Sequence, residues 1–179
     1  MFYFSLTHEQ IAYQVAALIN CHNGLSQKRS VADVQTGRTH YVVETHGQWV
    51  LGAVGLDRQG YTFTEIKHLA VHTEWRGKGI AKLLLKRALN IANTKMVYAT
   101  VREDNEASLK LFESLGFRRS GDYSAVDHRV VLLVRVSPQW EQVKSASKSQ
   151  LLDDEAMLNE LDLCRPTYST LSTCEEESG

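Results

Sequence analysis

The feature that most constrains the fold is a strand that runs into a helix through a glycine-containing loop. β-Favouring residues occupy 61–71, and apolar residues at helical spacing follow in 80–91. Between them lies the segment 76–81, with the sequence RGKGIA. Glycines let the backbone approach a ligand closely, and the first turn of a helix offers unpaired N–H groups at the positive end of its dipole. This combination is typical of an anion site, and pyrophosphate is a common ligand there.

Other interpretations of this segment are weaker. The plainest is a strand–helix connection in which the glycines only ease a turn. A dinucleotide-binding fingerprint requires three glycines, and the segment has two. A kinase-type phosphate loop requires Gly-Lys followed by Ser or Thr, which does not occur in the chain.

Composition indicates a soluble globular protein. Of the 179 residues, 43% are hydrophobic and 23% are charged, which is ordinary for one domain. No apolar run approaches the roughly 20 residues that span a bilayer, and residues 1–6 lack the features of a signal peptide. The cysteines Cys21, Cys164 and Cys174 are scattered and odd in number, which argues against a disulfide framework and a zinc site. We therefore expect a cytoplasmic protein without a metal.

Charge is distributed unevenly along the chain. Residues 1–136 carry 17 Lys/Arg and 12 Asp/Glu, a net charge of +5, whereas residues 137–179 carry 3 and 9, a net charge of −6. The basic part suits a polyanionic cofactor but is too weakly charged to favour nucleic acid. The acidic extension, residues 137–179, contains an amphipathic helical pattern around 150–163, and its charge predicts disorder beyond it. We expect it to dock on the basic part, a second subunit or a partner protein; the alternative is a tail disordered throughout.

Hydrophobic periodicity and turn signals predict an α/β fold. The predicted helices are 7–20, with Thr7 and Gln10 as a capping box, a short one from Ser30 to Gly37, 80–91, and one from Asp104 or Asn105 to Gly116. The predicted strands are 2–6, 40–44, 49–56, 61–71, 95–101, 117–120 and 130–136. This order predicts an antiparallel meander that continues into a mixed sheet with helices on both faces.

Two segments resemble signatures of the GCN5-related N-acetyltransferases (GNAT). Residues 76–81, Arg-x-x-Gly-x-Ala behind an apolar strand, resemble the coenzyme A pyrophosphate loop of this family. Residues 105–117, NEASLKLFESLGF, resemble the family pattern Asn-x-x-Ala-x-x-Leu-Tyr-x-x-x-Gly-Phe. With the element order, the resemblance covers residues 1–136. It implies the GNAT fold: a mixed, mostly antiparallel sheet with helices on both faces and a splayed central strand pair.

The resemblance implies acetyl-CoA as co-substrate, held between the strand that ends at Val71 and the strand 96–101. Backbone groups of Leu69, Ala70 and Val71 would pair with the pantetheine arm like an added strand. The pyrophosphate would lie on the loop residues, namely Arg76, Gly77, Lys78, Gly79, Ile80 and Ala81. Asn105 would meet the pantetheine arm or cap its helix, and the two roles are compatible. Ser108 and Phe112, on the same helix, are further cofactor-binding candidates.

The resemblance implies direct attack of a primary amine on the acetyl group in a ternary complex. The amine must lose a proton, because a lysine-like ammonium has a pKa of about 10.4. Glu65 is the first candidate for the base, since a glutamate at this position has this role in the histone-acetyltransferase branch, which residues 64–71 resemble. The alternative is a solvated glutamate paired with Lys67 or Arg58. His68 is the second candidate; alternation makes it face away from Glu65 unless a β-bulge intervenes, and its alternative is a structural histidine.

Phe112 departs from the family pattern, in which a tyrosine protonates the departing thiolate. Phenylalanine has no proton to give. Tyr123, Tyr98 or water would substitute, Ser108 would assist, or the thiolate would leave without an acid. The departure motivates an alternative function, a catalytically weak or inactive GNAT-fold module that binds a protein partner.

In the family, the acceptor is bound by the first helices and the last hairpin loop. Here these are residues 21–38 and 121–128. Asp122, Asp127 and Glu65 would attract a cationic amine, although charged loop residues are often only solvated.

Overall fold

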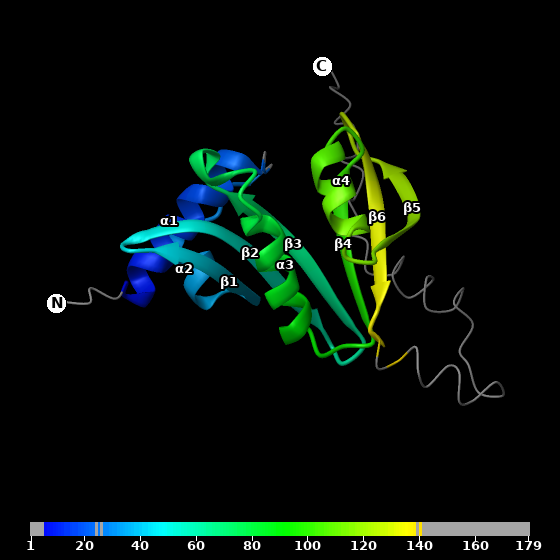
Figure 1. Cartoon of the computed structure of the whole chain (residues 1–179), viewed down its shortest axis with the longest axis horizontal. Coiled ribbons are helices and arrows are strands. Elements are labelled where there is room, and N and C mark those ends of the chain that lie inside the picture. The colour runs from blue at the N-terminus through cyan, green and yellow to red at the C-terminus, as the bar shows by residue number, and fades with distance from the viewer. Residues whose placement is uncertain (1–5, 24, 26, 139, 141–179) are drawn as a thin grey trace, which may run out of the picture. The chain divides into compact units, whose positions relative to one another are not determined.

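The fold is a mixed six-stranded sheet with the strand order β1-β2-β3-β4-β6-β5 (Figure 1). A computed structural model describes residues 6–23, 25, 27–138 and 140. The strands are β1 (Thr39–His46), β2 (Trp49–Gln59), β3 (Phe63–Val71), β4 (Met96–Arg102), β5 (Arg118–Ser124) and β6 (Arg129–Val136). Neighbouring strands are antiparallel except β3 and β4, which are parallel. The predicted mixed α/β architecture is confirmed.

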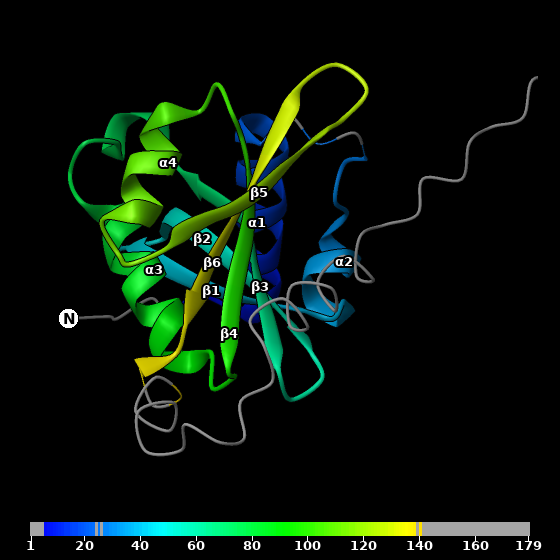
Figure 2. The same cartoon turned by 90° about the vertical axis from the view of Figure 1, so that its right-hand side faces the viewer.

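Helices cover both faces of the sheet, as Figures 1 and 2 show. They are α1 (His8–His22), α2 (Val31–Thr36), α3 (Ile80–Ile91) and α4 (Glu106–Glu113), with a 3-10 turn at Thr73–Trp75. Two of them start with the capping signals read from the sequence. Thr7 and Gln10 form a capping box on α1, and Ser30 caps α2. None of the helices in the described part of the chain has the length and apolar character needed to cross a membrane.

Helix α3 packs closely on β2 because Gly52 has no side chain. A Cβ at Gly52 would lie 2.9 Å from Leu84 Cδ1 and 3.2 Å from Ile80 Cγ2. Leu84 is fully buried in the apolar cluster on this side of the sheet. A second cluster, built around Val15 and Ile19 of α1, fills the other side. Core packing therefore anchors the strand and the helix on either side of the loop.

Several predicted strand boundaries are wrong. β1 continues to His46 rather than Glu44, and β2 continues to Gln59 rather than Leu56. β3 begins at Phe63 rather than Tyr61, because β2 continues to Gln59 and Gly60, with φ +66°, starts the turn. Tyr61 is 90% exposed in that turn. Strand β5 continues to Ser124 rather than ending at residue 120, so the hairpin connection is shorter than the predicted loop.

Two further predictions fall largely on residues that the structure does not describe. The predicted strand 2–6 lies outside the described residues except for Leu6. The acidic extension 137–179 lies outside them except for Ser137, Pro138 and Trp140. The predicted amphipathic helix around 150–163 therefore stays a prediction.

Candidate active site

A cleft of about 590 Å³ opens where the two parallel strands separate. Strands β3 and β4 pair only between 63–66 and 96–99, and Figure 1 shows them diverging beyond that point. The cleft is lined by the separated parts of both strands, by the segment after α1 and by α4. In the described sheet, the edge of residues 67–71 that faces β4 has no strand partner. Its N–H and C=O groups can therefore pair with an extended ligand. The predicted splayed strand pair is confirmed.

A β-bulge shapes the β3 wall of this cleft. The β2–β3 register shifts next to the Gly55–Lys67 pair, where β3 carries an extra residue. His68 lies in the bulge with φ +56°, and no other non-glycine residue in the described chain has a positive φ. Because of the bulge, Glu65 and His68 both line the cleft, so the alternation of side chains along a regular strand does not hold here.

Glu65 is held by a chain of ion pairs across β2 and β3. Lys67 Nζ lies 3.1 Å from Glu65 Oε2 and 2.6 Å from Asp57 Oδ2. The Glu65 side chain is only 20% exposed, so it is not the solvated glutamate of the alternative interpretation, although Lys67 is its partner. The ion pair therefore orients a carboxylate that borders the cleft.

His68 is partly buried and hydrogen-bonded to Tyr41 of β1. The Tyr41 hydroxyl lies 2.8 Å from His68 Nδ1. Burial, with a smaller contribution from the charge of Arg29, lowers the pKa of His68 to about 4. Burial raises the pKa of Tyr41 to about 12, so both groups are neutral at neutral pH. His68 is therefore a neutral, hydrogen-bonded histidine beside the cleft, and the roles of Glu65 and His68 as proton acceptors stay predictions.

The loop after β3 has the backbone geometry of an anion site. Gly77 and Gly79 have φ angles of +75° and +80°. A Cβ on either would meet no protein atom within 4 Å, so conformation rather than crowding requires glycine there. Gly79 is the N-cap of α3 and provides no side-chain hydrogen bond, so the first N–H groups of α3 are open to an anionic ligand.

Arg76 and Lys78, two of the predicted pyrophosphate-loop residues, also brace this loop. Arg76 Nε donates to the Val71 carbonyl oxygen at 3.1 Å, and its Nη2 lies 3.0 Å from His22 Nδ1. The Lys78 ammonium lies 4.2 Å from the centre of the Trp75 ring, a cation–π contact. Arg76 thus ties the loop to the ends of β3 and α1.

Helix α4 borders the other side of the cleft. Asn105 Oδ1 accepts a hydrogen bond from the Ser108 N–H at 3.1 Å, so the predicted N-cap role is confirmed. Asn105, Ser108 and Phe112 all line the cleft. Phe112 is 3% exposed and packs edge-on against Phe117 at 5.0 Å between ring centres. It is therefore both a core residue and part of the cleft wall.

Comparison with known proteins agrees with this geometry. Residues 10–117 match the Acetyltransferase (GNAT) family. The chain belongs to the GNAT family. It is 35% identical over 92 residues to the N-alpha-acetyltransferase RimI of Mycobacterium tuberculosis, a match that covers 50% of this chain and 58% of RimI. It is 36% identical over 90 residues to the N-acetylaspartate synthetase of Danio rerio, covering 49% of this chain and 32% of that protein.

Solved GNAT structures share the fold. The structure of yncA from Salmonella typhimurium with its cofactor acetyl-CoA superposes with a TM-score of 0.59 at 17% identity, over 70% of this chain and 86% of yncA. At this identity the likeness concerns the fold alone. The matched stretch spans little more than half of RimI and about a third of the Danio rerio synthetase.

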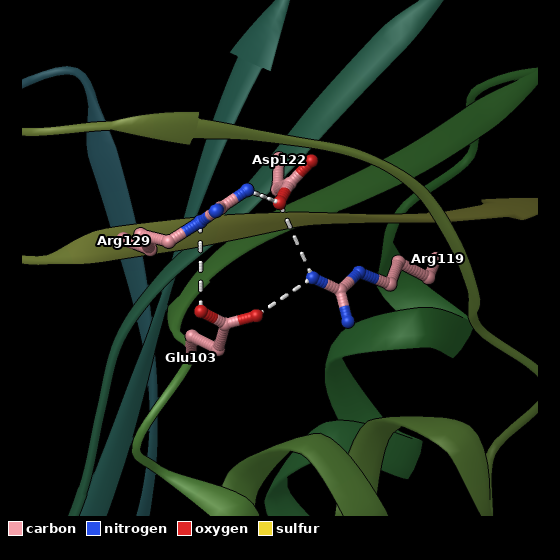
Figure 3. Close-up of polar contacts among 4 residues, drawn as sticks. All are labelled: Glu103, Arg119, Asp122 and Arg129. Atoms are coloured by element: carbon pink, nitrogen blue, oxygen red, sulfur yellow. Dashed lines mark hydrogen bonds and ion pairs between the residues drawn. The ribbon is translucent and has the colours of Figure 1, made fainter.

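The β5–β6 hairpin, where GNAT proteins are expected to contact the acceptor, has a charge network that is internally paired (Figure 3). Arg119 Nη2 lies 3.0 Å from Glu103 Oε1 and 3.4 Å from Asp122 Oδ2. Arg129 pairs with the same two acids, its Nε 3.6 Å from Glu103 Oε2. The network joins the end of β4 to the hairpin. Asp122, which was expected to attract a cationic amine, is already held by two arginines.

Neither tyrosine candidate lines the cleft among the described residues: Tyr98 is a buried residue of β4. Tyr123 is on β5 opposite Val130 and is not among the described residues that line the cleft. Its role as the acid that protonates the thiolate stays a prediction. In the described part of the chain, no three His, Cys, Asp or Glu residues lie close enough together to hold a metal ion.

The sequence analysis did not single out two residues of this GNAT cleft region: Arg29, which lies within the predicted acceptor segment 21–38, and Tyr41. Arg29 lines the cleft, and Tyr41 holds His68. A usable signal was Gly55, because a glycine inside a strand often marks a bulge or a close backbone approach. A Cβ at Gly55 would lie 2.6 Å from Thr39 Cγ2 and 3.1 Å from the Lys67 carbonyl oxygen, beside the bulge that holds His68.

Proposed function

We propose that this chain transfers an acetyl group from acetyl-CoA to a primary amine in a ternary complex. One observation carries the proposal: the unpaired edge of β3 leads directly into a glycine loop at the start of α3. An extended arm along residues 69–71 and a diphosphate at residues 76–81 match the two ends of coenzyme A. Asn105, Ser108 and Phe112 would contact the arm from α4.

The chemistry needs one proton acceptor and no covalent enzyme intermediate. The amine nitrogen attacks the acetyl carbonyl carbon, a C–N bond forms, and the C–S bond breaks to release coenzyme A as a thiolate. Glu65 accepts the amine proton directly or through water, because its carboxylate borders the cleft in a fixed orientation. His68 is the second candidate. Phe112 cannot protonate the thiolate, which leaves unprotonated or takes a proton from water or Tyr123.

Binding and turnover are tested separately. Titration calorimetry with coenzyme A should give saturable heat, and free thiol should appear from acetyl-CoA only when a suitable amine is present. Absence of heat with coenzyme A would overturn the proposal at its first step. Binding without thiol release for any amine would instead support a GNAT-fold binding module.

We also propose that the protein is cytoplasmic.

We further propose a docking role for the acidic extension 137–179, which would bind to its own basic part, to a second copy or to a protein partner. The net charge of −6 against +5 in residues 1–136 supports this role. Deleting residues 145–179 should change oligomeric mass or acetyl transfer. An unchanged mass and rate would leave the extension without such a role.

A further inference from the structure

Arg29 is a cleft residue whose position is set by α1. Its backbone N–H donates to Asn20 Oδ1 at 2.8 Å, and Asn20 Nδ2 donates to its carbonyl oxygen at 2.8 Å. A single side chain thus clamps both backbone groups of Arg29, and Ser30 then caps α2 directly after it. The residue is fixed from both sides, so its side chain starts from a defined point on the cleft wall.

The Arg29 side chain borders the cleft, and its Nε lacks a hydrogen-bond partner among the described residues. This Nε atom is buried. No ion pair to its guanidinium occurs in the described part of the chain. Leaving a buried charged donor unpaired costs free energy, and such a group calls for an explanation. A ligand that accepts hydrogen bonds supplies one.

The other cations that line the cleft are already engaged. Lys67 joins the carboxylates of Asp57 and Glu65. Arg102 holds Asp104 through two hydrogen bonds, of 3.1 and 2.8 Å. Among the described residues, Arg29 is therefore the arginine or lysine of the cleft that has no ion-pair partner, and it lies in the same cleft as the Glu65 carboxylate.

We infer that the amine acceptor carries a carboxylate, which Arg29 binds while the amine faces Glu65. This inference rests on the proposed function, because it concerns the second substrate of that reaction. The planar guanidinium matches a carboxylate and can bind it through two hydrogen bonds. A polyamine would bring further positive charge to Arg29 and leave its donors unpaired. The carboxylate is unchanged in the reaction; only the amine gains the acetyl group and loses a proton.

Matched acceptors test this class. Thiol release is measured with the free L-amino acids, with their α-carboxamides and with spermidine. The free acids should have the higher kcat/KM, because removing one charged hydrogen-bonding partner costs roughly tenfold to a hundredfold. Equal or better turnover of the amides or of spermidine would overturn the inference and leave the proposed acetyl transfer intact.

Two variants locate the effect. Arg29→Gln should raise KM and lower kcat/KM for the acids about tenfold to a hundredfold, and leave the amides unchanged. Lys28→Gln removes the same charge from the exposed neighbouring residue and should change neither. Equal losses for acids and amides in Arg29→Gln would show a structural role, which thermal melting would confirm. If no amine is acetylated, calorimetry of an acid and its amide with the coenzyme A complex decides: equal affinities overturn the inference.

Discussion

The cleft wall proposed to receive coenzyme A is built from backbone, whereas the wall toward the acceptor is built from side chains. The first is contiguous in sequence: a strand edge, two glycines with positive φ and the start of α3. The second is assembled from distant segments, with Asn20 holding Arg29 and Tyr41 holding His68. A backbone site depends on conformation and tolerates most side-chain changes. A side-chain site can change its ligand through single substitutions, which suits a family whose relatives carry the names of different acetylation reactions.

The largest effect that would separate the two walls is expected from Glu65→Gln. Loss of a general base lowers kcat by about 10²–10⁴-fold, while coenzyme A affinity should stay unchanged. Rate assays across pH measure kcat, and calorimetry measures the affinity for coenzyme A. Glu74→Gln, an exposed glutamate near the loop, serves as the control. An unchanged rate and pH profile in Glu65→Gln would remove Glu65 from the mechanism.

The partly buried His68–Tyr41 pair on the side-chain wall provides a second test. The pKa of His68 is about 4 in the folded protein and about 6.5 when unfolded, so the unfolded chain binds the extra proton between these values. Stability should therefore fall as pH falls from about 6.5 to about 4. Over this pH range, the free energy of unfolding of His68→Asn should fall by on the order of 2 kcal/mol less than that of the wild type. Asparagine suits the positive φ at this position. Chemical denaturation at several pH values measures this free energy.

The control for that experiment is His40→Asn, because His40 is exposed on β1. Its stability should follow the wild-type pH dependence. A His68→Asn variant with the same pH dependence as the wild type would show that His68 is not kept neutral by burial.

The smallest effect tests the backbone wall. Gly79→Ala forces an alanine into a left-handed conformation, which costs about 1–2 kcal/mol, and should weaken coenzyme A binding about tenfold. Gly60→Ala is a matched control, since Gly60 has φ +66° and an equally open surrounding but lies in the β2–β3 turn. Calorimetry should show the affinity loss only in Gly79→Ala. Equal affinities in both variants would contradict a phosphate role for the loop.

The sequence predicts the backbone wall better than the side-chain wall. Capping residues such as Thr7 and Asn105, and the glycines of the loop, act on their near neighbours in the chain, so local patterns predict them. The bulge at His68 depends on how β3 pairs with β2. The position of Arg29 depends on a hydrogen bond to Asn20, nine residues earlier in the chain. Such contacts are set by tertiary packing, which propensity and periodicity do not contain.

The joint between β3 and β4 has a consequence for variants far from any ligand. In the described sheet, β3 and β4 connect the half formed by β1–β3 to the half formed by β4–β6 through four residue pairs, from Phe63–Met96 to Ile66–Ala99. A buried hydrogen bond of 2.9 Å between the hydroxyls of Thr64 and Thr94 reinforces this short hinge line. Substitutions at Phe63, Thr64 or Thr94, none of which is among the described residues that line the cleft, would therefore alter the angle between the two halves and with it the width of the cleft.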